Sequence, residues 1–468
     1  MLFNSLTFLV FAICFFALWP IFNQRKNSRW TYLTVASFTF YGWWDWRFLF
    51  LIIGSGLIDY ISALAMEKWP SRKRAFLWFS LIGNIGSLSV FKYSFFFASI
   101  IDALFVFVGI KTNLQHHIPS FALILPVGIS FFTFQSMSYT IDVYKGQLKP
   151  TSNVLHFFSY LAMFPQLVAG PIVRAKDLLG QLSEKRTTNW LQRWHGVKLI
   201  VFGLFQKTVI ADNLGVLVDT AYQGKTSIDN GLFWWIVLIA FAFQIYCDFS
   251  GYSLMARGLA KLMGYHFKMN FNHPYLAISL RDFWTRWHIS LSSWFRDYVY
   301  IPLGGSRKGF WRGIVFMSIT MIISGLWHGA ALTFIAWGAI HAFFLAIERL
   351  TGWTKSAPTF LVRIAVWVQV LVAWNYFRAG SISQANEIVA KLWGNWEQFE
   401  QIKELFYDPL FFLLMTILIE LSIYLRRRNP SIRALYARWY LDTPAVAVAM
   451  AAAIYLRGPS ANFIYFQF

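Results

Sequence analysis

The first residue that could do chemistry is His328, which lies in the segment 324–330 with the sequence SGLWHGA. This segment falls within Gly313–Ile347, the longest stretch without Asp, Glu, Lys or Arg. Polar groups among membrane helices are costly and tend to face a cavity, a partner or a reaction centre. A dry site disfavours a charged imidazole, so His328 could act there as a general base. The alternative is a buried histidine that is hydrogen-bonded between helices.

A second histidine, His288, lies in the segment 261–312, which is rich in Trp, Tyr, Arg, Asn and His. We interpret this segment as interfacial or inward-folded. At 100° per residue a helix here would place polar residues on one face and large apolar residues on the other. The polar face would carry Arg281, Thr285, His288, Ser292 and Arg296, and the apolar face Phe283, Trp287, Leu291, Trp294 and Tyr298. The alternative for His288 is a side chain that meets water or lipid headgroups.

The remaining histidines and acids suggest structural roles. His341 is thirteen residues after His328, which on one straight helix turns it about 220° away. Six other histidines lie in loops or near span ends, where we expect surface or interface positions: His116, His117, His156, His195, His266 and His273. Five acids are candidates for buried or boundary positions: Asp59, Asp102, Asp142, Asp248 and Glu420.

Several other kinds of chemistry lack their motifs. A zinc site needs three or four ligands, but the two cysteines are Cys14 and Cys247 and no His-x-x-x-His spacing occurs, so we expect no metal. The chain has no Gly-x-Ser-x-Gly elbow and no phosphate loop. These absences argue against a serine hydrolase and an ATP-driven pump.

The composition predicts the elements that position these residues. The chain is 57% apolar, only 13% charged and has a mean hydropathy of +0.49, which indicates an all-α polytopic membrane protein in a phospholipid bilayer. Its formal charge is +20, from 41 Lys and Arg against 21 Asp and Glu. The bases form short clusters between apolar runs, as cytoplasmic loops do, so we expect no nucleic-acid partner. These clusters lie at 25–29, 68–74, 185–186 and 426–428.

The apolar runs predict roughly ten to twelve membrane segments, some of them re-entrant. The clearest are Ser5–Phe22, Ala75–Phe91, Ile118–Ile141, Val154–Val173, Gly231–Cys247 and Gly313–Ile347, and weaker ones are Leu49–Met66, Leu199–Ala211, Ile364–Phe377, Pro409–Leu425 and Thr443–Leu456. The run Gly313–Ile347 would be about 52 Å long as one helix, so it must bend, break or double, and Gly325–Gly329 is the expected break.

The first run lacks a basic segment before it and a cleavage site after it, so we expect it to be retained as a helix. If it enters from outside, the early basic loops fall on the cytoplasmic side and the N-terminus is extracytoplasmic. With no internal repeat and no long linker, we predict one membrane domain over 1–468.

Five motifs in their order along the chain resemble the membrane-bound O-acyltransferase family, in its bacterial polysaccharide-modifying branch. They are FPQLVAGPI at 164–172, RDFWTRWHISL at 281–291, DYVYIPLGG at 297–305, GLWHG at 325–329 and FIYFQF at 463–468. Within the branch the chain looks closest to the membrane subunits of alginate O-acetylation. Those of peptidoglycan O-acetylation are near relatives, and D-alanyl-teichoic-acid proteins are more distant. The resemblance implies a ring of helices around a thinned centre, with a tunnel joining a cytoplasmic funnel to the outer face.

The resemblance also implies roles for individual residues. His328 matches the catalytic histidine of the family and His288 the second histidine of the branch. Trp327 and backbone amides near Gly329 are candidate oxyanion donors, Ser324 is a supporting candidate, and Gln166 is either an amide contact in the tunnel or a helix-packing residue.

The implied reaction moves an acetyl group from a cytoplasmic thioester, in the simplest case acetyl-CoA, towards hydroxyls of an extracytoplasmic polysaccharide such as alginate or peptidoglycan. No tightly bound cofactor is expected. The basic loops would draw the phosphates of CoA, and an extracytoplasmic acyltransferase or acetyl-carrier protein is the expected partner. The expected location is the bacterial inner membrane.

Two other classes stay open. A transporter of acyl groups or lipid-linked sugars would also need many spans, although inverted repeats and intramembrane acidic relays are not evident. A non-catalytic scaffold for a secreted transferase would leave His328 dispensable.

Overall fold

The computed structural model describes residues 1–168, 170–224, 228, 230–394, 396, 403–429, 439–461 and 463–464. These residues are mostly helical and include no β-strand, which confirms the all-α prediction. Ala169 in the first family motif and residues 465–468 in the last lie outside the described residues. The chain divides into two compact units, 1–196 with 259–268, and 197–258 with 269–468.

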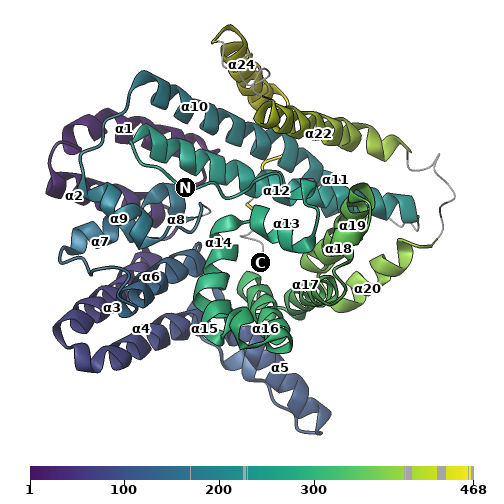
Figure 1. Ribbon diagram of the computed structural model, residues 1–468, viewed down its shortest axis with the longest axis horizontal. Helices are drawn as coiled ribbons and strands as arrows, with labels where there is room; N and C mark the ends of the chain where they lie inside the picture. The colour runs from purple at the N-terminus through teal and green to yellow at the C-terminus, as the bar shows by residue number, and fades with distance from the viewer. Residues whose placement is uncertain are drawn as a thin grey trace. The chain divides into compact units, whose positions relative to one another are not determined.

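The first unit begins with the N-terminal helices (purple to blue in Figure 1) and ends in the first turns of α10. Its α-helices are α1 Leu6–Phe22, α2 Lys26–Gly42, α3 Leu49–Lys68, α4 Lys73–Leu88, α5 Ser94–Phe107, α6 Ile129–Tyr144, α7 Val154–Leu161, α8 Phe164–Leu167 and α9 Ala175–Ser183. Its short 3₁₀ helices are η1 Trp46–Phe48, η2 Pro70–Arg72, η4 Leu114–His117 and η5 Ser120–Leu123, and η3 Ser89–Tyr93 is a π-helical turn.

Helices α3, α4 and α6 pack side by side (Figure 1). Polar side chains meet between them. Asp59 on α3 is fully buried and accepts hydrogen bonds from Asn84 Nδ2 at 2.9 Å, from Thr140 Oγ1 at 3.0 Å and from the Ser80 hydroxyl. Buried charge needs such satisfied partners. The carboxylate therefore joins the three helices from inside, as its expected buried position required.

The second unit contains the remaining helices, and α10 Trp190–Phe205 and α12 Gly231–Leu262 belong partly to each unit. Its α-helices are α11 Asp212–Tyr222, α13 Leu280–Arg286, α14 Ile289–Phe295, α15 Ile301–Leu303, α16 Phe310–His328, α17 Leu332–Thr351, α18 Trp353–Ser356, α19 Thr359–Arg378, α20 Ile382–Lys391, α22 Tyr407–Arg428 and α24 Trp439–Tyr455. The 3₁₀ helices are η7 Pro274–Leu276, η9 Gly305–Lys308 and η10 Lys403–Phe406, and the π-helical turns are η6 Gln206–Ala211 and η8 Arg296–Tyr300.

A buried ion cluster ties the C-terminal segment to the second unit. Lys207 Nζ lies 2.7 Å from Asp212 and 2.9 Å from Asp248, and it donates to Ala461 O at 3.1 Å. Asp248 Oδ2 also accepts the backbone N–H of Ile464 at 2.7 Å. A cation shared by two carboxylates balances most of the charge that burial would otherwise penalise.

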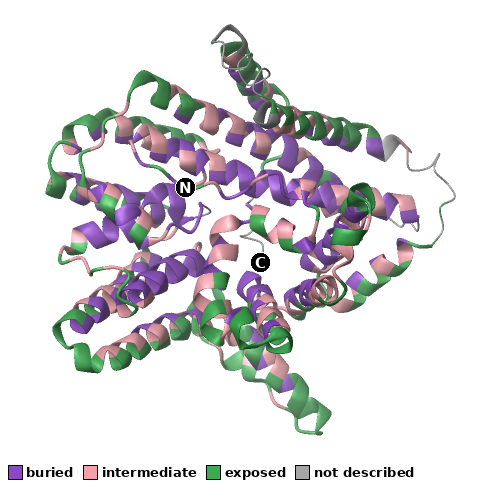
Figure 2. Ribbon diagram, in the orientation of Figure 1, coloured by how far each residue is buried: buried purple, intermediate pink, exposed green. Residues whose placement is uncertain are grey.

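Eight helices in the described chain are long and apolar enough to cross a membrane, and α1 and Asp442–Tyr455 are shorter apolar helices. Two predicted spans are wrong. Val154–Val173 forms only the short α7 and α8, and Ile118–Ile141 holds η5 and most of α6. Apart from Phe121 on η5, which is 59% exposed, their aromatic residues are buried inside the protein, as the buried colour of α6 to α8 in Figure 2 shows. An apolar sequence is therefore common to membrane spans and to segments buried in the core of this protein.

Candidate active site

His328 lies where one helix stops and the next begins. Helix α16 ends at His328, Gly329 and Ala331 have extended backbone, and α17 starts at Leu332. The predicted break of the long apolar run is confirmed, at the C-terminal edge of the predicted glycine segment. The last carbonyl groups of a helix have no intrahelical hydrogen-bond partners. His328 therefore lies beside backbone groups that no following helical turn covers.

Glycines bring α16 and α17 into close contact. A Cβ added to Gly325 would lie 2.2 Å from Phe334 O, and one added to Gly338 would lie 2.5 Å from Met321 O. Small residues permit this approach between membrane helices. At Gly329 the ring of Phe334 fills the space, because a Cβ would lie 2.0 Å from its Cε2. The glycines around His328 therefore serve helix packing.

Aromatic rings surround the imidazole of His328. The centroid of its ring lies 5.0 Å from those of Trp327 and Trp337 and 5.3 Å from that of Phe377. All three rings meet the imidazole edge to face, at angles of 72° to 82°. His328 is 5% exposed. This packing restricts the plane of the imidazole, which a positioned general base requires.

His288 occupies a sharp turn between two short helices. The predicted continuous helix over 281–296 is wrong, because α13 ends at Arg286, α14 begins at Ile289 and His288 has a left-handed backbone with φ 42°. The side chain is fully buried, so the alternative in which His288 meets water or lipid headgroups is wrong. A residue other than glycine with a left-handed backbone is strained, and strain of this kind is often found at functional sites.

Asn270 is the hydrogen-bonding partner of this turn. Its Oδ1 lies 3.3 Å from His288 Nδ1 and accepts the N–H of Ser290 at 3.1 Å and its hydroxyl at 2.8 Å. The N–H of Ile289 donates to Asn270 O at 2.9 Å. With Nδ1 donating to the amide oxygen, Nε2 is the basic nitrogen of His288. Burial lowers the pKa of His288 to about 3, so the ring is neutral at ordinary pH.

Trp327 connects the two histidines. Its ring centroid lies 5.0 Å from that of His328 and 6.4 Å from that of His288. Ser324, one turn before His328 on α16, is 4% exposed. The structure therefore brings His288, Ser324, Trp327 and His328 together in the second unit. The N–H of Gly329 points back to Gly325 O at 3.4 Å.

The rings of Trp337 and Phe377 beside His328 were not recognised from the sequence. His341 was expected to face away from His328, but the helix break changes its direction and places it 4.8 Å from Trp337, which itself contacts His328. Within the described chain neither ring nitrogen of His341 has a hydrogen-bond partner, and nor does the indole N–H of Trp337. Trp337 is thus a further buried donor beside His328. A single tryptophan within an apolar helix does not distinguish a residue beside the site from one that packs elsewhere, so the sequence did not indicate Trp337.

Gln166 belongs to the first unit. It is fully buried on α8, and its Nε2 donates to Tyr160 O at 2.7 Å. Tyr160 lies in the last turn of α7, where helical carbonyls need partners. Of the two predicted roles, this contact supports helix packing.

Two of the histidines for which we expected surface or interface positions are buried inside the protein. His156 stacks on Trp30 at 4.4 Å and its ring nitrogens contact Thr151 and Leu179, while His273 Nδ1 lies 2.5 Å from Glu420. Both hold neighbouring segments together through hydrogen bonds. The other four, His116, His117, His195 and His266, are exposed as expected.

The family model for the membrane-bound O-acyltransferase family matches residues 145–383, which include all the residues of this site. The chain belongs to this family and is a multi-pass membrane O-acyltransferase, which confirms the resemblance seen in the motifs.

Curated relatives agree with this assignment. The chain is 38% identical to the probable alginate O-acetylase AlgI of Pseudomonas putida over 86% of this chain and 82% of that protein. It is 34% identical to the peptidoglycan O-acetyltransferase of Helicobacter pylori over 78% and 73%, respectively. The teichoic acid D-alanyltransferase of Bacillus subtilis is more distant, at 29% identity over 52% and 63%.

Proposed function

We propose that this protein transfers an acetyl group from a cytoplasmic thioester, acetyl-CoA in the simplest case, across the membrane towards a hydroxyl of an extracytoplasmic polysaccharide. The observation that supports this most is the position of His328 at the end of α16, packed among Trp327, Trp337 and Phe377 and contacting His288 through Trp327. The relatives named as alginate and peptidoglycan O-acetylating enzymes suggest the acceptor class.

In this proposal His328 is the general base. One imidazole nitrogen takes the proton of the acceptor hydroxyl as its oxygen attacks the thioester carbonyl carbon. The new bond joins the acyl carbon to the acceptor oxygen, and the C–S bond breaks. The leaving thiolate takes the proton back from His328. The products are an O-acetyl ester and a free thiol.

The developing oxyanion needs hydrogen-bond donors. The indoles of Trp327 and Trp337 carry ring N–H groups and pack against His328, and both side chains are at least 96% buried. Donors that are already oriented in a dry site stabilise the transition state without reorganising. We assign this role to these indoles in preference to the amide of Gly329, which is turned towards Gly325.

His288 acts as a positioning residue in this scheme. Its neutral ring is held by Asn270 through Nδ1, so Nε2 is left as the acceptor nitrogen that can orient a hydroxyl. The acceptor hydroxyl belongs to the polysaccharide or to an extracytoplasmic carrier protein that passes the acetyl group on. The site of action is the bacterial inner membrane, with the N-terminus on the outer side.

The test is acetyl transfer by His328→Gln. In proteoliposomes supplied with acetyl-CoA, thiol release should fall by about 10²-fold or more, which is the usual contribution of a general base. O-acetylation of the cell's polysaccharide should fall with it. His195→Gln, at an exposed histidine, is the matched control and should behave as wild type at equal membrane levels.

Two outcomes would refute this function. Polysaccharide O-acetylation that survives His328→Gln would support a non-catalytic scaffold. Thioester-independent movement of acetyl groups or sugars across the bilayer, unaffected by His328→Gln, would support a transporter.

A further inference from the structure

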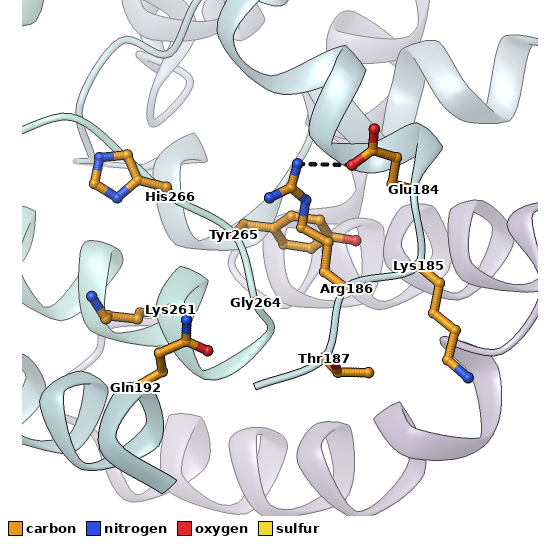
Figure 3. A pocket seen from close by; sticks show the side chains of 9 residues that line it. All are labelled: Glu184, Lys185, Arg186, Thr187, Gln192, Lys261, Gly264, Tyr265 and His266. Carbon is orange, nitrogen blue, oxygen red and sulfur yellow. Dashed lines mark hydrogen bonds and ion pairs between the residues drawn. The ribbon is translucent and has the colours of Figure 1, made fainter. Parts of the chain in front are cut away.

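A basic pocket of about 360 Å³ opens in the first unit, and none of its lining residues is assigned to acyl transfer above. One wall is the loop from α9 into α10, and the other is the end of α12 with the turn that follows (Figure 3). Its lining residues are Glu184, Lys185, Arg186, Thr187, Gln192, Lys261, Gly264, Tyr265 and His266. We propose that this pocket binds a phosphate ester, most readily the phosphate of a lipid headgroup.

The charge of the lining fits an anion. Lys185, Arg186 and Lys261 carry three positive charges and Glu184 one negative charge. The single ion pair among them, Arg186 to Glu184 at 3.0 Å, is solvent-exposed, with 37% and 70% of the two side chains accessible. Exposed pairs contribute little stability. A phosphate can therefore replace Glu184 on the planar guanidinium, which matches phosphate oxygens in pairs.

Buried donors in the pocket point to a ligand independently of charge. Tyr265 is 2% exposed, and within the described chain its hydroxyl has no hydrogen-bond partner. The Nε–H of Arg186 is likewise buried without a partner there. Buried polar groups in native proteins are almost always satisfied by protein, water or ligand. A phosphate supplies acceptor oxygens for donors of this kind.

The walls are held in place by contacts that do not use the side-chain cations of Arg186 and Lys261, whereas Lys185 Nζ donates to Gln24 Oε1. Gln181 bonds both backbone groups of His266, at 2.8 and 3.1 Å, and Asn23 Nδ2 donates to Arg186 O at 2.9 Å. Gly264 has φ 93°, and a Cβ there would lie 2.9 Å from Arg186 Cβ, so only glycine allows the two walls to approach this closely. A site formed before the ligand arrives loses less entropy on binding.

The position along the chain favours a lipid headgroup as the source of the phosphate. The pocket lies where one candidate span, Trp190–Tyr222, begins and another, Gly231–Leu262, ends. The first of these starts with Trp190 and Leu191, which are 75% and 73% exposed. Exposed tryptophan at the end of a span is typical of the membrane interface. Basic pockets between span ends bind anionic headgroups on the cytoplasmic side.

The test measures binding of short-chain dihexanoyl phosphatidylglycerol to the purified full chain in uncharged detergent, with dihexanoyl phosphatidylcholine as the zwitterionic comparison. Phosphatidylglycerol should bind saturably and more tightly. Each cation near an anionic headgroup contributes about five-fold to affinity, so Arg186→Gln with Lys261→Gln should weaken binding about thirty-fold. Tyr265→Phe, which removes one hydroxyl, should weaken it several-fold.

The matched control is Arg193→Gln with Lys268→Gln, which removes the same charge from two exposed residues of the same region that do not line the pocket. This control should leave binding unchanged. Competition by inorganic pyrophosphate, without any preference for phosphatidylglycerol, would support the phosphate site but assign it to a soluble ester. If the double variant does not fold, Lys261→Gln and Tyr265→Phe alone decide the question. Equal affinity in these variants and wild type, or an equal loss in the control, would overturn the proposal.

Discussion

Replacing Gly325 by alanine should damage the active site through the backbone alone. The added Cβ would lie 2.2 Å from Phe334 O, 3.1 Å from Phe334 C and 3.3 Å from Gly338 N. All three atoms belong to the backbone of α17, so no side chain can rotate away. Because Cβ contacts below 3.0 Å essentially do not occur, α17 must move by at least 0.8 Å relative to α16.

The expected magnitude follows from two opposing terms. Overpacking of a tight contact costs about 1–3 kcal/mol. Alanine in place of glycine inside a helix returns up to about 1 kcal/mol through lower backbone entropy. The variant should therefore be about 1–2 kcal/mol less stable than wild type. Since His328 lies three residues after Gly325 and contacts Trp337 on α17, activity should fall further, by about 10- to 100-fold for a shift approaching 1 Å.

The assay compares Gly325→Ala with Gly54→Ala in the same detergent and the same proteoliposomes. Gly54 lies inside α3, where an added Cβ would meet no atom within 4 Å. The control should match or slightly exceed wild type in melting temperature and in acetyl transfer. Gly325→Ala should melt a few degrees lower and transfer acetyl groups more slowly per folded molecule.

The refuting result is a Gly325→Ala protein with the melting temperature and acetyl-transfer rate of Gly54→Ala. Such a result would mean that α16 and α17 are free to separate without consequence. Close packing of these two helices would then have no part in holding His328.

Three further predictions test other parts of the chain. The pKa of His288 is about 3 in the folded protein, below its ordinary value near 6.5, so its contribution to stability is present above pH 6.5 and is lost as the pH falls. The free energy of unfolding should therefore drop by about 2 kcal/mol between pH 7 and 5. His288→Gln should remove this part of the acid sensitivity, as measured by melting at a series of pH values. Lys207→Met should lower stability by about 3–5 kcal/mol, because it leaves Asp212 and Asp248 buried without their cation. The yield of monodisperse protein after detergent extraction should fall, and adding Asp248→Asn should recover part of it. A double variant with no recovery would contradict this account. Gln166→Leu should lower stability by about 1 kcal/mol with unchanged transfer per folded molecule, whereas lost transfer at full stability would indicate a substrate contact.

The position of His328 was predictable because local rules determine it. A charge-free run too long for one helix must break, and its glycines indicated where. The structure ends α16 at His328, next to that segment. The family motif lies at the same place, so backbone physics and chemistry pointed to one residue.

The position of His288 was not predictable from helical periodicity. A period of 3.6 assumes one continuous helix, but the chain turns at His288 with φ 42°. The turn depends on Asn270, eighteen residues earlier, which accepts hydrogen bonds from Ser290 and contacts His288. Such a long-range contact leaves no periodic pattern. The straight helix assumed for His341 does not exist either, because the chain breaks between His328 and Leu332.

The two histidines are thus held by different physical means, and the difference bears on function. His328 is oriented by rings and by the close contact of two helices, so its geometry depends on packing that any shift of α17 would disturb. His288 is oriented by a left-handed turn that costs of order 1–3 kcal/mol and persists only because Asn270 and Ser290 hold it. A site built in this way keeps two imidazoles in fixed positions inside a membrane protein, and burial keeps that of His288 neutral. Oriented bases of this kind suit proton transfer from a hydroxyl, which agrees with acyl transfer.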